Sequence, residues 1–551
     1  MAERNSLLNC RTGKLVPRVR IPLSPQKLLN RSSGCSAAGS VPGLGPGGRR
    51  FESYYPDTAK QPLTQEAAFI LHLISPKKMY QQYINGTWQP ATNGKTLAVI
   101  NPATQEHIQN IAYGDQNDCI AALNAAQAAF EKWKTSPYKR AAILQKAAAL
   151  MRAKNTEYAA ITTAESGKPL AESKGEWLVA AGFFEWFAEE AKRTYGKTIP
   201  SSRPNKRMQV IYQPMGIVGA ITAWNFPAYN PARCWAAALA AGCCIVAKPS
   251  ELTPITAMCI AECLHEAGLP AGVLNLINGD ASAIADVLLT DKRCKKISFT
   301  GSTRVGKLLM QGSHQTATKL ALELGGNAPV LVFDDVNVDE LAETAALAKN
   351  RNCGQVCIAP QRFLVQRPIY EAFTQKIAEK VANLRIGNGT ELDTQVGPLI
   401  SENQRLMVHN LVQKSVAQGA KLLCGGKIAE HAQGYFYEPT VLADVAPHHD
   451  IFKNEVFGPV LSITPFDTTE QALALANDTE YGLIAYVFTQ NLKNATLASE
   501  GLEFGMVGIN DFAPHAIEAP FGGWKQSGVG QEGGSEGILE YMEKKLIGTV
   551  I

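Results

Sequence analysis

Four short apolar segments decide the fold: GIVGAITA (216–223), CCIVA (243–247), VLNLI (273–277) and KKISFT (295–300). Three stretches with helical periodicity separate them, and these begin near Asn230, Ile255 and Ala281. Strands that alternate with helices in this way predict a parallel sheet covered by helices on both faces. We therefore expect an α/β fold built on an open parallel sheet.

Each apolar segment ends in a polar or glycine-rich step. The steps are Trp224-Asn225, Lys248-Pro249-Ser250-Glu251, Asn278-Gly279-Asp280 and Thr300-Gly301-Ser302. Ligands of open parallel sheets bind beyond the carboxyl ends of the strands. We therefore expect the four steps to share one crevice.

The chemistry of that crevice suits a dinucleotide. Lys248 and Glu251 combine an ammonium group with a carboxylate that can bind ribose hydroxyls, and the carboxylate would repel a 2'-phosphate. This favours NAD and leaves NADP possible. Gly301 and Ser302 precede the helix-like TRVGKLL, so they should lie at a helix N-terminus, which attracts phosphate. GSTRVG lacks the full GxGxxG spacing and fits a plain turn equally well, but the four steps together predict a Rossmann-type cofactor sheet.

A second stretch, KNRNCGQVCIAP (349–360), is the candidate for covalent chemistry. Cys357 follows NCGQV, which is typical of a tight turn, so its thiol should be presented rather than packed. Glu323 ends the strand-like LALEL and meets Gly325-Gly326, which should hold its carboxylate beside the crevice. A thiol that forms an acyl adduct needs a base, either for itself or for the water that releases the acyl group. We expect Cys357 to be the nucleophile and Glu323 the base.

Composition narrows the classes of function. A chain of 551 residues exceeds one ordinary core, so two or more domains are expected, and 46% apolar with 19% charged residues is globular. The net charge of +4, with no Lys/Arg run in the body, disfavours nucleic acid as a partner. The longest apolar run (235–247) contains Gly242 and is too short to cross a membrane, so it predicts a helix end and a buried strand.

The twelve cysteines have no regular spacing, which predicts free thiols in a reducing compartment. No CxxC or HExxH motif occurs, and no metal site is expected. Cys259 and Cys263 lie four residues apart on a probable helix face, and we interpret them as core residues.

The first 78 residues differ from the rest. Residues 1–50 carry seven Arg and two Lys against one acid, Glu3, with many Ser, Gly and Pro and no apolar periodicity. Such a segment buries too little apolar surface to fold. It is interpreted as an extension from an upstream start codon, with the true start near Met79 and a cytoplasmic location. The alternative is an Arg-rich transit peptide that directs the chain to the mitochondrial matrix.

The remaining patterns describe scaffold and chain ends. MYQQYINGTWQP (79–90) predicts an edge strand and a turn, and residues 117–191 have helical patterns. Residues 199–214 fit either an arm that contacts another subunit or an ordinary surface hairpin. LEYMEKKLIGTVI (539–551) alternates like an edge strand, and an exposed strand at a chain end invites pairing with another subunit.

Seven motifs occur in order along the chain: WNFP (224–227), KPSE (248–251), FTGS (299–302), ELGG (323–326), GQVC (354–357), EVFGPV (455–460) and PFGG (520–523). In this series the chain resembles the aldehyde dehydrogenase superfamily from about Tyr80 to the C-terminus. The resemblance implies a Rossmann-type open sheet for the cofactor, an α/β catalytic domain and a small oligomerisation arm. It also implies a homodimer or homotetramer.

The resemblance assigns roles to these residues. Cys357 matches the nucleophile that attacks the aldehyde carbon, and Asn225 matches the donor that binds the oxyanion together with the Cys357 N–H. Hydride then passes to the nicotinamide, and Glu323 matches the base that activates water to hydrolyse the thioester. A water-activating base argues against a CoA-acylating enzyme. The matching cofactor contacts are Trp224, Asn225, Lys248, Pro249, Ser250, Glu251, Gly279, Gly301, Ser302, Leu324, Glu455 and Phe457.

Two arginines narrow the substrate. Arg233 lies eight residues after Asn225 and Arg351 six before Cys357, so both could face the aldehyde pocket. An Arg in an apolar stretch either pairs with an acid or binds a substrate carboxylate. The arrangement resembles the succinate-semialdehyde dehydrogenases, which implies oxidation of a short ω-oxo carboxylate, first of all succinate semialdehyde to succinate.

The chain departs from that subfamily in two places. Ala359 stands where many members have a second cysteine of a redox switch, which leaves Cys353 as the nearest thiol and redox regulation open. Pro514-His515-Ala516 replaces a loop that often carries serines, and His515 either contacts the substrate or fills space. These departures keep 2-oxoglutarate semialdehyde as an alternative substrate. A non-enzymatic binding or structural protein is a remote alternative, because the nucleophile and the base are both present.

We expect the chain to divide as follows: an extension (1–78), a NAD-binding domain (79–198 and 214–323), a catalytic domain (324–517), and bridging or oligomerisation elements (199–213 and 518–551).

Overall fold

The structure is a computed structural model that describes residues 81–430 and 433–551, all of them within one compact unit. The expectations for residues 1–78, including a transit peptide or a start near Met79, lie outside the described residues.

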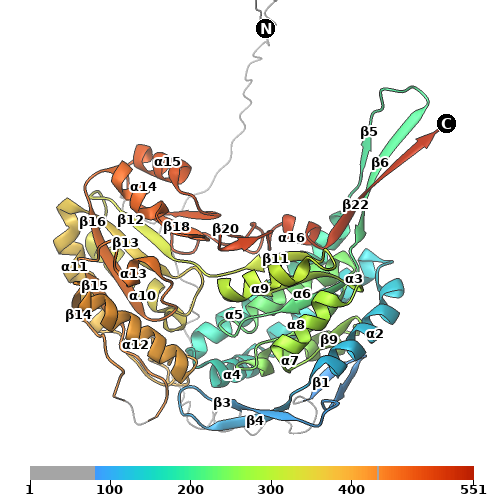
Figure 1. The fold of residues 1–551 in the computed structure, drawn as a ribbon, viewed down its shortest axis with the longest axis horizontal. Coiled ribbons are helices and arrows are strands. Elements are labelled where there is room, and N and C mark those ends of the chain that lie inside the picture. Colours follow the sequence, from blue (N-terminus) through green and yellow to red (C-terminus); the bar gives the residue numbers. More distant parts are fainter. Residues whose placement is uncertain (1–80, 431–432) are drawn as a thin grey trace, which may run out of the picture. The chain divides into compact units, whose positions relative to one another are not determined.

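The predicted alternation of strands and helices forms an eight-stranded sheet with the order β2-β1-β9-β8-β7-β10-β11-β21 (Figure 1). The strands from β7 to β11 are parallel, as the sequence predicts, and the β1-β2 hairpin and β21 add antiparallel edges. The order reverses at β7, and such a switch point is where a ligand crevice opens at the carboxyl ends of the strands. The strands are β1 (Gln82–Ile84), β2 (Thr87–Gln89), β7 (Ile217–Ile221), β8 (Cys244–Lys248), β9 (Leu274–Leu276), β10 (Cys294–Thr300), β11 (Lys319–Glu323) and β21 (Gly528–Val529).

Helices cover both faces of this sheet. One face is covered by α2 (Gln116–Trp133), α8 (Ala281–Thr290) and α9 (Thr303–Ser313). The other is covered by α6 (Tyr229–Ala241) and α7 (Pro254–Glu266), against which α3 (Pro137–Ala153), α4 (Asn155–Ser166) and α5 (Leu170–Glu190) pack. α6 is almost entirely buried, and Cys259 and Cys263 are core residues of α7, as interpreted from the sequence.

A second, seven-stranded sheet has the order β14-β15-β16-β13-β12-β18-β19. Alternate residues of β12 and β13 enter cores on opposite faces: Val330 and Val332 belong to one cluster, and Leu331 to the other. Its strands are β12 (Ala328–Val332), β13 (Pro360–Gln366), β14 (Lys421–Cys424), β15 (Thr440–Ala443), β16 (Val460–Phe466), β18 (Ile484–Phe488) and β19 (Met506–Ile509). Its helices are α10 (Val338–Asn350), α11 (Arg367–Ala382), α12 (Glu402–Ala417), α13 (Asp450–Lys453), α14 (Thr469–Asn477) and α15 (Leu492–Gly501).

A three-stranded sheet with the order β22-β6-β5 contains the predicted hairpin and the C-terminal strand. β22 (Met542–Val550) pairs along its whole length with β6 (Lys206–Pro214), which pairs with β5 (Lys197–Ile199). Figure 1 shows these strands extending away from the helices. The other pieces are β3 (Thr96–Ile100), β4 (His107–Ala112), β17 (Tyr481–Gly482), β20 (Trp524–Lys525), α16 (Glu536–Leu539) and the 3-10 turns η1 (Ala191–Arg193) and η2 (Arg351–Gly354).

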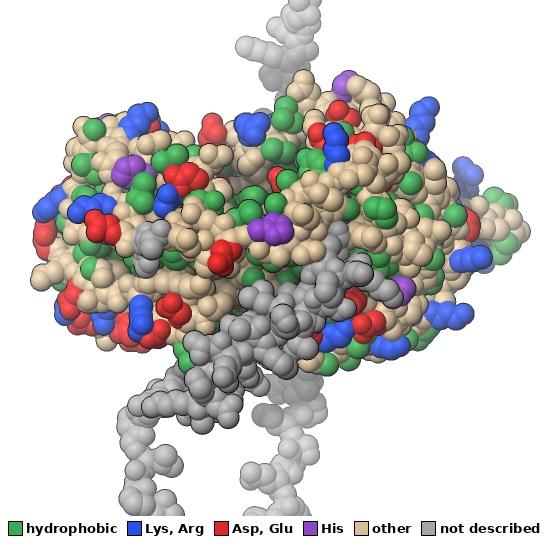
Figure 2. Space-filling view, turned by 90° about the horizontal axis from the view of Figure 1, so that it is seen from below, with side chains coloured by type: hydrophobic (Ala, Val, Ile, Leu, Met, Phe, Trp, Pro, Cys, Tyr) green, Lys and Arg blue, Asp and Glu red, His purple; other side chains and the backbone are tan. Residues whose placement is uncertain are grey.

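Figure 2 shows one face of the molecule, on which Lys and Arg side chains are interspersed with Asp and Glu side chains. Among the described residues, no helix combines the length and the apolar character needed to cross a membrane.

Candidate active site

Left-handed backbone shapes the loop that carries Cys357. In η2, the φ angles of Asn352, Cys353 and Gly354 are 49°, 55° and 69°. Only glycine fits the third position, because a Cβ there would lie 2.1 Å from the carbonyl oxygen of Gly458. The turn buries Cys353 completely and leaves Cys357 partly exposed, so Cys357 is the presented thiol, as the sequence predicts.

Asn225 follows β7 and is fixed by hydrogen bonds at both ends of its amide. Asn230 Nδ2 donates to Asn225 Oδ1 at 3.1 Å, and Asn225 Nδ2 donates to the Gln355 carbonyl at 3.1 Å. Asn352 Nδ2 also donates to the Asn225 carbonyl, at 2.9 Å. These bonds tie Asn225 to the Cys357 loop and leave its second amide N–H for another acceptor.

Glu323 is the last residue of β11 and is 4% exposed, at the crevice where the sequence places it. Burial raises the pKa of its carboxyl group to about 7, against the opposing effects of Arg233 and of hydrogen bonding to the Cys357 thiol. Arg233 Nη2 lies 3.6 Å from Glu323 Oε2, whereas Oε1 has no hydrogen-bond partner in the described chain. The carboxyl group therefore titrates near neutral pH with one oxygen free to take a proton.

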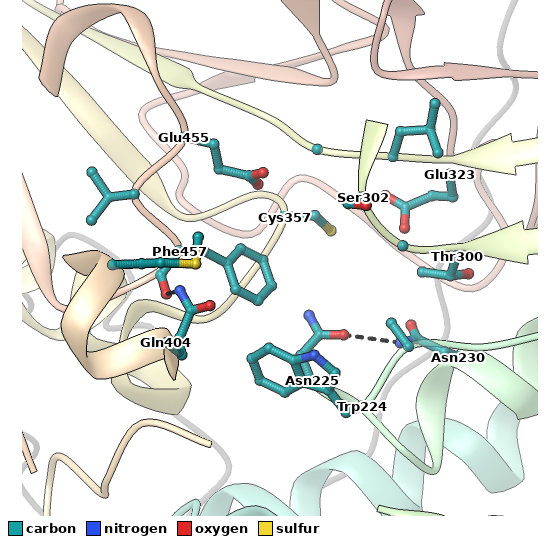
Figure 3. A pocket seen from close by; sticks show the side chains of 16 residues that line it. Trp224, Asn225, Asn230, Thr300, Ser302, Glu323, Cys357, Gln404, Glu455 and Phe457 are labelled. Carbon is teal, nitrogen blue, oxygen red and sulfur yellow. Dashed lines mark hydrogen bonds between the residues drawn. The ribbon is translucent and has the colours of Figure 1, made fainter. Parts of the chain in front are cut away.

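The Cys357 thiol needs such a base. Burial raises its pKa well above the usual value, and the neighbouring Glu323 carboxylate adds to this effect. Figure 3 shows the side chains of Cys357, Glu323 and Asn225 directed into the same cavity. A nucleophile, a base and an amide donor thus surround one volume.

Aromatic side chains line this cavity. The rings of Trp224 and Phe457 are in edge-to-face contact, with 5.4 Å between their centroids, and Gln404 Nε2 donates to the Phe457 carbonyl at 2.9 Å. Phe457 has a left-handed φ of 50°, which this bond helps to hold. Of the expected cofactor contacts, the cavity is lined by Trp224, Asn225, Gly301, Ser302, Leu324, Glu455 and Phe457.

The other expected contacts lie at the ends of β8 and β9 and do not line this cavity: Lys248, Pro249, Ser250, Glu251 and Gly279. Lys248 Nζ donates to Glu251 Oε2 at 2.8 Å, so the pair that the sequence places side by side is formed. The Lys248 side chain is buried, whereas that of Glu251 is 46% exposed. The Glu251 carboxylate is thus accessible at the carboxyl edge of the sheet.

These residues fit a dinucleotide. Gly301 precedes α9. A Cβ at Gly301 would lie 2.4 Å from the Phe299 ring, so this turn has no room for a side chain at position 301. Ser302 caps α9, whose first N–H groups form the type of end that binds phosphate. Glu455 Oε1 accepts the Gly326 N–H at 3.0 Å, and burial raises the pKa of its carboxyl group to about 7. The site therefore offers polar groups for ribose and phosphate beside an apolar aromatic wall.

The two arginines line a second, smaller cavity, which meets the first at Cys357. Arg233 is 1% exposed, and its Nε lies 2.5 Å from Glu532 Oε2, so the acidic partner of a structural arginine is present. The Arg351 guanidinium makes no hydrogen bond or ion pair within the described chain and lies 5.4 Å from the centre of the Phe226 ring. Of the two arginines, only Arg351 is left without an ion-pair partner in the described chain.

A buried ion pair below Asn225 was not predicted from the sequence. Lys168 Nζ lies 2.5 Å from Glu176 Oε2 and donates to the Asn225 carbonyl at 2.7 Å. Glu176 Oε1 accepts the N–H groups of residues 228 and 229. An acid inside the apolar GEWLVAAGFF helix was the available signal, because a buried acid needs a partner.

Other supporting residues gave weaker signals. Asn230 is a polar residue in the apolar helix α6, and its sequence pattern indicates only the start of a helix. Glu532 and Gln404 lie in segments without a chemical pattern, and their contacts with Arg233 and Phe457 depend on tertiary folding.

Comparison with known proteins places the chain in a family. The model of the aldehyde dehydrogenase family matches residues 88–547. A glutarate-semialdehyde dehydrogenase of Pseudomonas putida is 44% identical over 468 residues, which are 85% of this chain and 97% of that protein. The succinate-semialdehyde dehydrogenase (NADP(+)) GabD of Escherichia coli is 42% identical over 84% of this chain and 96% of its own length.

A solved structure of an aldehyde dehydrogenase has the same fold as this chain. Betaine aldehyde dehydrogenase of Staphylococcus aureus in complex with NAD+ has a TM-score of 0.86 and 36% identity, covering 88% of this chain and 97% of that one. The chain belongs to the aldehyde dehydrogenase family, as the seven motifs predict, and it is an oxidoreductase.

Proposed function

We propose that the chain oxidises a short ω-oxo carboxylate, first of all succinate semialdehyde, to the dicarboxylate, with NAD as cofactor and NADP possible. The observation that carries this proposal is the Arg351 guanidinium, which lies in the cavity beside the Cys357 thiol and forms no ion pair within the described chain. A carboxylate at the far end of a short aldehyde would form a charge-assisted hydrogen bond there. The activities for which the Pseudomonas and Escherichia relatives are named support the same class of substrate.

In the first half of the reaction, Glu323 takes the thiol proton of Cys357 and the thiolate adds to the aldehyde carbon. Asn225 Nδ2 and the Cys357 N–H, which has no partner in the described chain, then stabilise the oxyanion. A donor of this kind contributes about 3–4 kcal/mol to lowering the barrier. Bound NAD(P) supplies the hydride acceptor that converts the adduct to a thioester.

In the second half, Glu323 removes a proton from the water that hydrolyses the thioester. Its buried carboxyl group, with a pKa of about 7, can both accept and release a proton at neutral pH. The acid product then leaves and the thiol is restored.

We assign the cofactor to the crevice at the carboxyl edge of the eight-stranded sheet. The adenosine ribose would be held by Lys248, Pro249, Ser250 and Glu251. The neighbouring phosphates would lie against the turns that contain Gly279, Gly301 and Ser302. Trp224, Asn225, Leu324, Glu455 and Phe457 would surround the nicotinamide end. The exposed carboxylate of Glu251 supports NAD over NADP, because it would repel a 2'-phosphate.

The domain division, the assembly and the location are further proposals. We keep the cofactor domain at 79–198 and 214–323, the catalytic domain at 324–517, and the bridging elements at 199–213 and 518–551. β22 is an edge strand with exposed Leu546 and Val550, which supports pairing in a homodimer or homotetramer. We propose a cytoplasmic location, or the mitochondrial matrix if residues 1–78 are a transit peptide.

A comparison of substrates tests the proposal. Purified enzyme is assayed with succinate semialdehyde, glutarate semialdehyde, 2-oxoglutarate semialdehyde and hexanal, each with NAD and with NADP. We expect the carboxylated aldehydes to have higher kcat/KM than hexanal, and NAD to exceed NADP. Equal or better turnover of hexanal contradicts the proposed substrate class.

A further inference from the structure

The cavity beside Cys357 contains His515, a polar side chain that the proposed reaction does not use. Its walls carry the rings of Phe226, Tyr229 and Phe521, and its polar groups are Asn230, Arg233, Arg351, His515 and the Tyr229 hydroxyl. Because Cys357 lines both cavities and the first is assigned to the nicotinamide end of the cofactor, an aldehyde bound at the thiol would extend its other end toward these polar groups.

The two arginines of this cavity differ in whether an acidic side chain pairs with them. Arg233 is paired with Glu532 at 2.5 Å and also lies near Glu323. Arg351 lies near Glu172, whose carboxylate accepts the Asn352 N–H at 2.9 Å, but the two charged groups do not form an ion pair. One anionic group is therefore expected at the Arg351 end, and a single carboxylate satisfies it.

His515 is placed among these groups without a partner. Its ring lies 6.5 Å from the Phe521 ring, nearly perpendicular to it, and makes no hydrogen bond within the described chain. Nδ1 is buried and unpartnered. A buried polar atom without a partner is unfavourable, so a ring nitrogen here is suited to a hydrogen bond from a ligand.

The imidazole is neutral in this setting. Burial and the charges of Arg351 and Arg233 lower the pKa of His515 to about 4. A neutral imidazole has one donor and one acceptor nitrogen, whereas an arginine has donors only. A plain carboxylate needs donors, which Arg351 already supplies, so an unsubstituted semialdehyde leaves the ring nitrogens of His515 without a partner.

We propose that His515 is a specificity-determining residue that hydrogen-bonds an oxygen substituent on the carbon next to the substrate carboxylate. The substrate class is then an ω-oxo acid with a keto or hydroxyl group at carbon 2. A keto oxygen accepts from the imidazole N–H, and a hydroxyl group donates to its free nitrogen. This inference rests on the proposed function, because it needs the carboxylate at Arg351.

Three aldehydes of equal chain length test the proposal: 5-oxopentanoate (glutarate semialdehyde), 2,5-dioxopentanoate (2-oxoglutarate semialdehyde) and 2-hydroxy-5-oxopentanoate. They differ only at carbon 2. We expect the wild-type enzyme to favour at least one 2-oxygenated compound over 5-oxopentanoate by about tenfold or more in kcat/KM, because a site built to bind an oxygen rejects the analogue that lacks it. The two oxygenated compounds distinguish a keto from a hydroxyl group. A wild-type preference for 5-oxopentanoate overturns the proposal.

Two variants separate hydrogen bonding from space filling. His515→Phe keeps a ring of similar size without nitrogen, and we expect it to remove the tenfold preference while changing kcat/KM for 5-oxopentanoate by less than about threefold. His515→Asn keeps a neutral donor and acceptor, and we expect it to retain part of the preference. If His515→Phe leaves the preference intact, or lowers kcat/KM for all three substrates equally, His515 only fills space.

Hexanal and the Arg351→Gln variant identify which proposal fails. If the wild-type enzyme oxidises the three acids better than hexanal, and Arg351→Gln lowers kcat/KM for all three, the proposed carboxylate site is supported. The His515 variants then decide the further inference independently of the proposed function. If hexanal is the better substrate, both proposals fall. Thermal unfolding of each variant confirms that the folded enzyme is being compared.

Discussion

Lys168 and Glu176 form an ion pair of 2.5 Å whose side chains are 0% and 2% exposed. The pair lies under the segment that follows β7: Lys168 Nζ donates to the Asn225 carbonyl and lies 4.1 Å from the centre of the Phe226 ring. Glu176 accepts the N–H groups of residues 228 and 229. One buried pair therefore holds both ends of the segment that carries the proposed oxyanion donor.

Lys168→Met should destabilise the enzyme and lower kcat. The change leaves the Glu176 carboxylate buried without its partner, which costs about 3–5 kcal/mol, and frees the Asn225 carbonyl. Urea unfolding measures the stability, and steady-state kinetics measures kcat. As a control, the double variant Lys168→Met/Glu176→Gln removes the unpaired charge and should recover part of the stability. Unchanged stability in Lys168→Met would show that the pair is not needed.

Cys357→Ala should abolish NADH formation, because no other thiol is presented to the cavity in the described chain. Cys353→Ala makes the same chemical change four residues earlier, at a fully buried side chain, and should leave turnover measurable. The assay is NADH absorbance with succinate semialdehyde. Turnover by the Cys357 variant would remove the covalent mechanism.

The sequence predicted the elements whose signal is local. Polar steps after apolar strands placed Asn225, Glu323 and the Lys248–Glu251 pair at one edge of a sheet, because side chains at the carboxyl ends of parallel strands must meet there. The thiol in the turn was found in the same way, because glycine and polar residues around Cys357 indicated an exposed loop.

The contacts that the sequence did not predict are long-range. Arg233 pairs with Glu532, and a sequence contains no signal for which distant acid a buried arginine will meet. The sequence therefore left open, for Arg233 and Arg351 alike, whether the side chain pairs with an acid or binds the substrate carboxylate. Only the tertiary structure shows that Arg233 has an acidic partner, whereas Arg351 forms no ion pair within the described chain.

The hydrolysis step should depend on pH through Glu323. Because burial raises the pKa of this carboxyl group to about 7, the base is protonated at pH 6 and ionised at pH 8, and deacylation should accelerate between them. Glu532 contributes to the raised pKa, so Glu532→Gln should shift the midpoint to lower pH. Single-turnover and steady-state rates across pH 5.5–9 separate acylation from deacylation. Glu323→Gln should keep the acylation burst better than the steady state, and a normal steady state in this variant would remove the assignment.

Arg351→Gln should raise KM for succinate semialdehyde more than for hexanal. Losing a hydrogen bond to a charged group costs about 1.5–3 kcal/mol, which corresponds to about 10- to 150-fold in kcat/KM. Arg233→Gln should act differently, because it leaves Glu532 buried without its cation, and we expect a lower Tm in addition to lower activity. Kinetics with both aldehydes and thermal unfolding make the comparison. Identical behaviour of the two variants would contradict the division of roles.

Glu251→Ser should improve the use of NADP relative to NAD. The Glu251 carboxylate is partly exposed at the end of β8 and is held by Lys248 at 2.8 Å, so it stands where the cofactor ribose is proposed to bind. Removing it abolishes repulsion of a 2'-phosphate and frees the Lys248 ammonium group to attract that phosphate. We expect the ratio of kcat/KM for NADP to that for NAD to rise about tenfold or more, a change of about 1.4 kcal/mol. Glu262→Ser, which changes an acid on α7 outside both cavities, is the control and should leave the ratio unchanged. An unchanged ratio in Glu251→Ser would mean that this carboxylate does not select the cofactor.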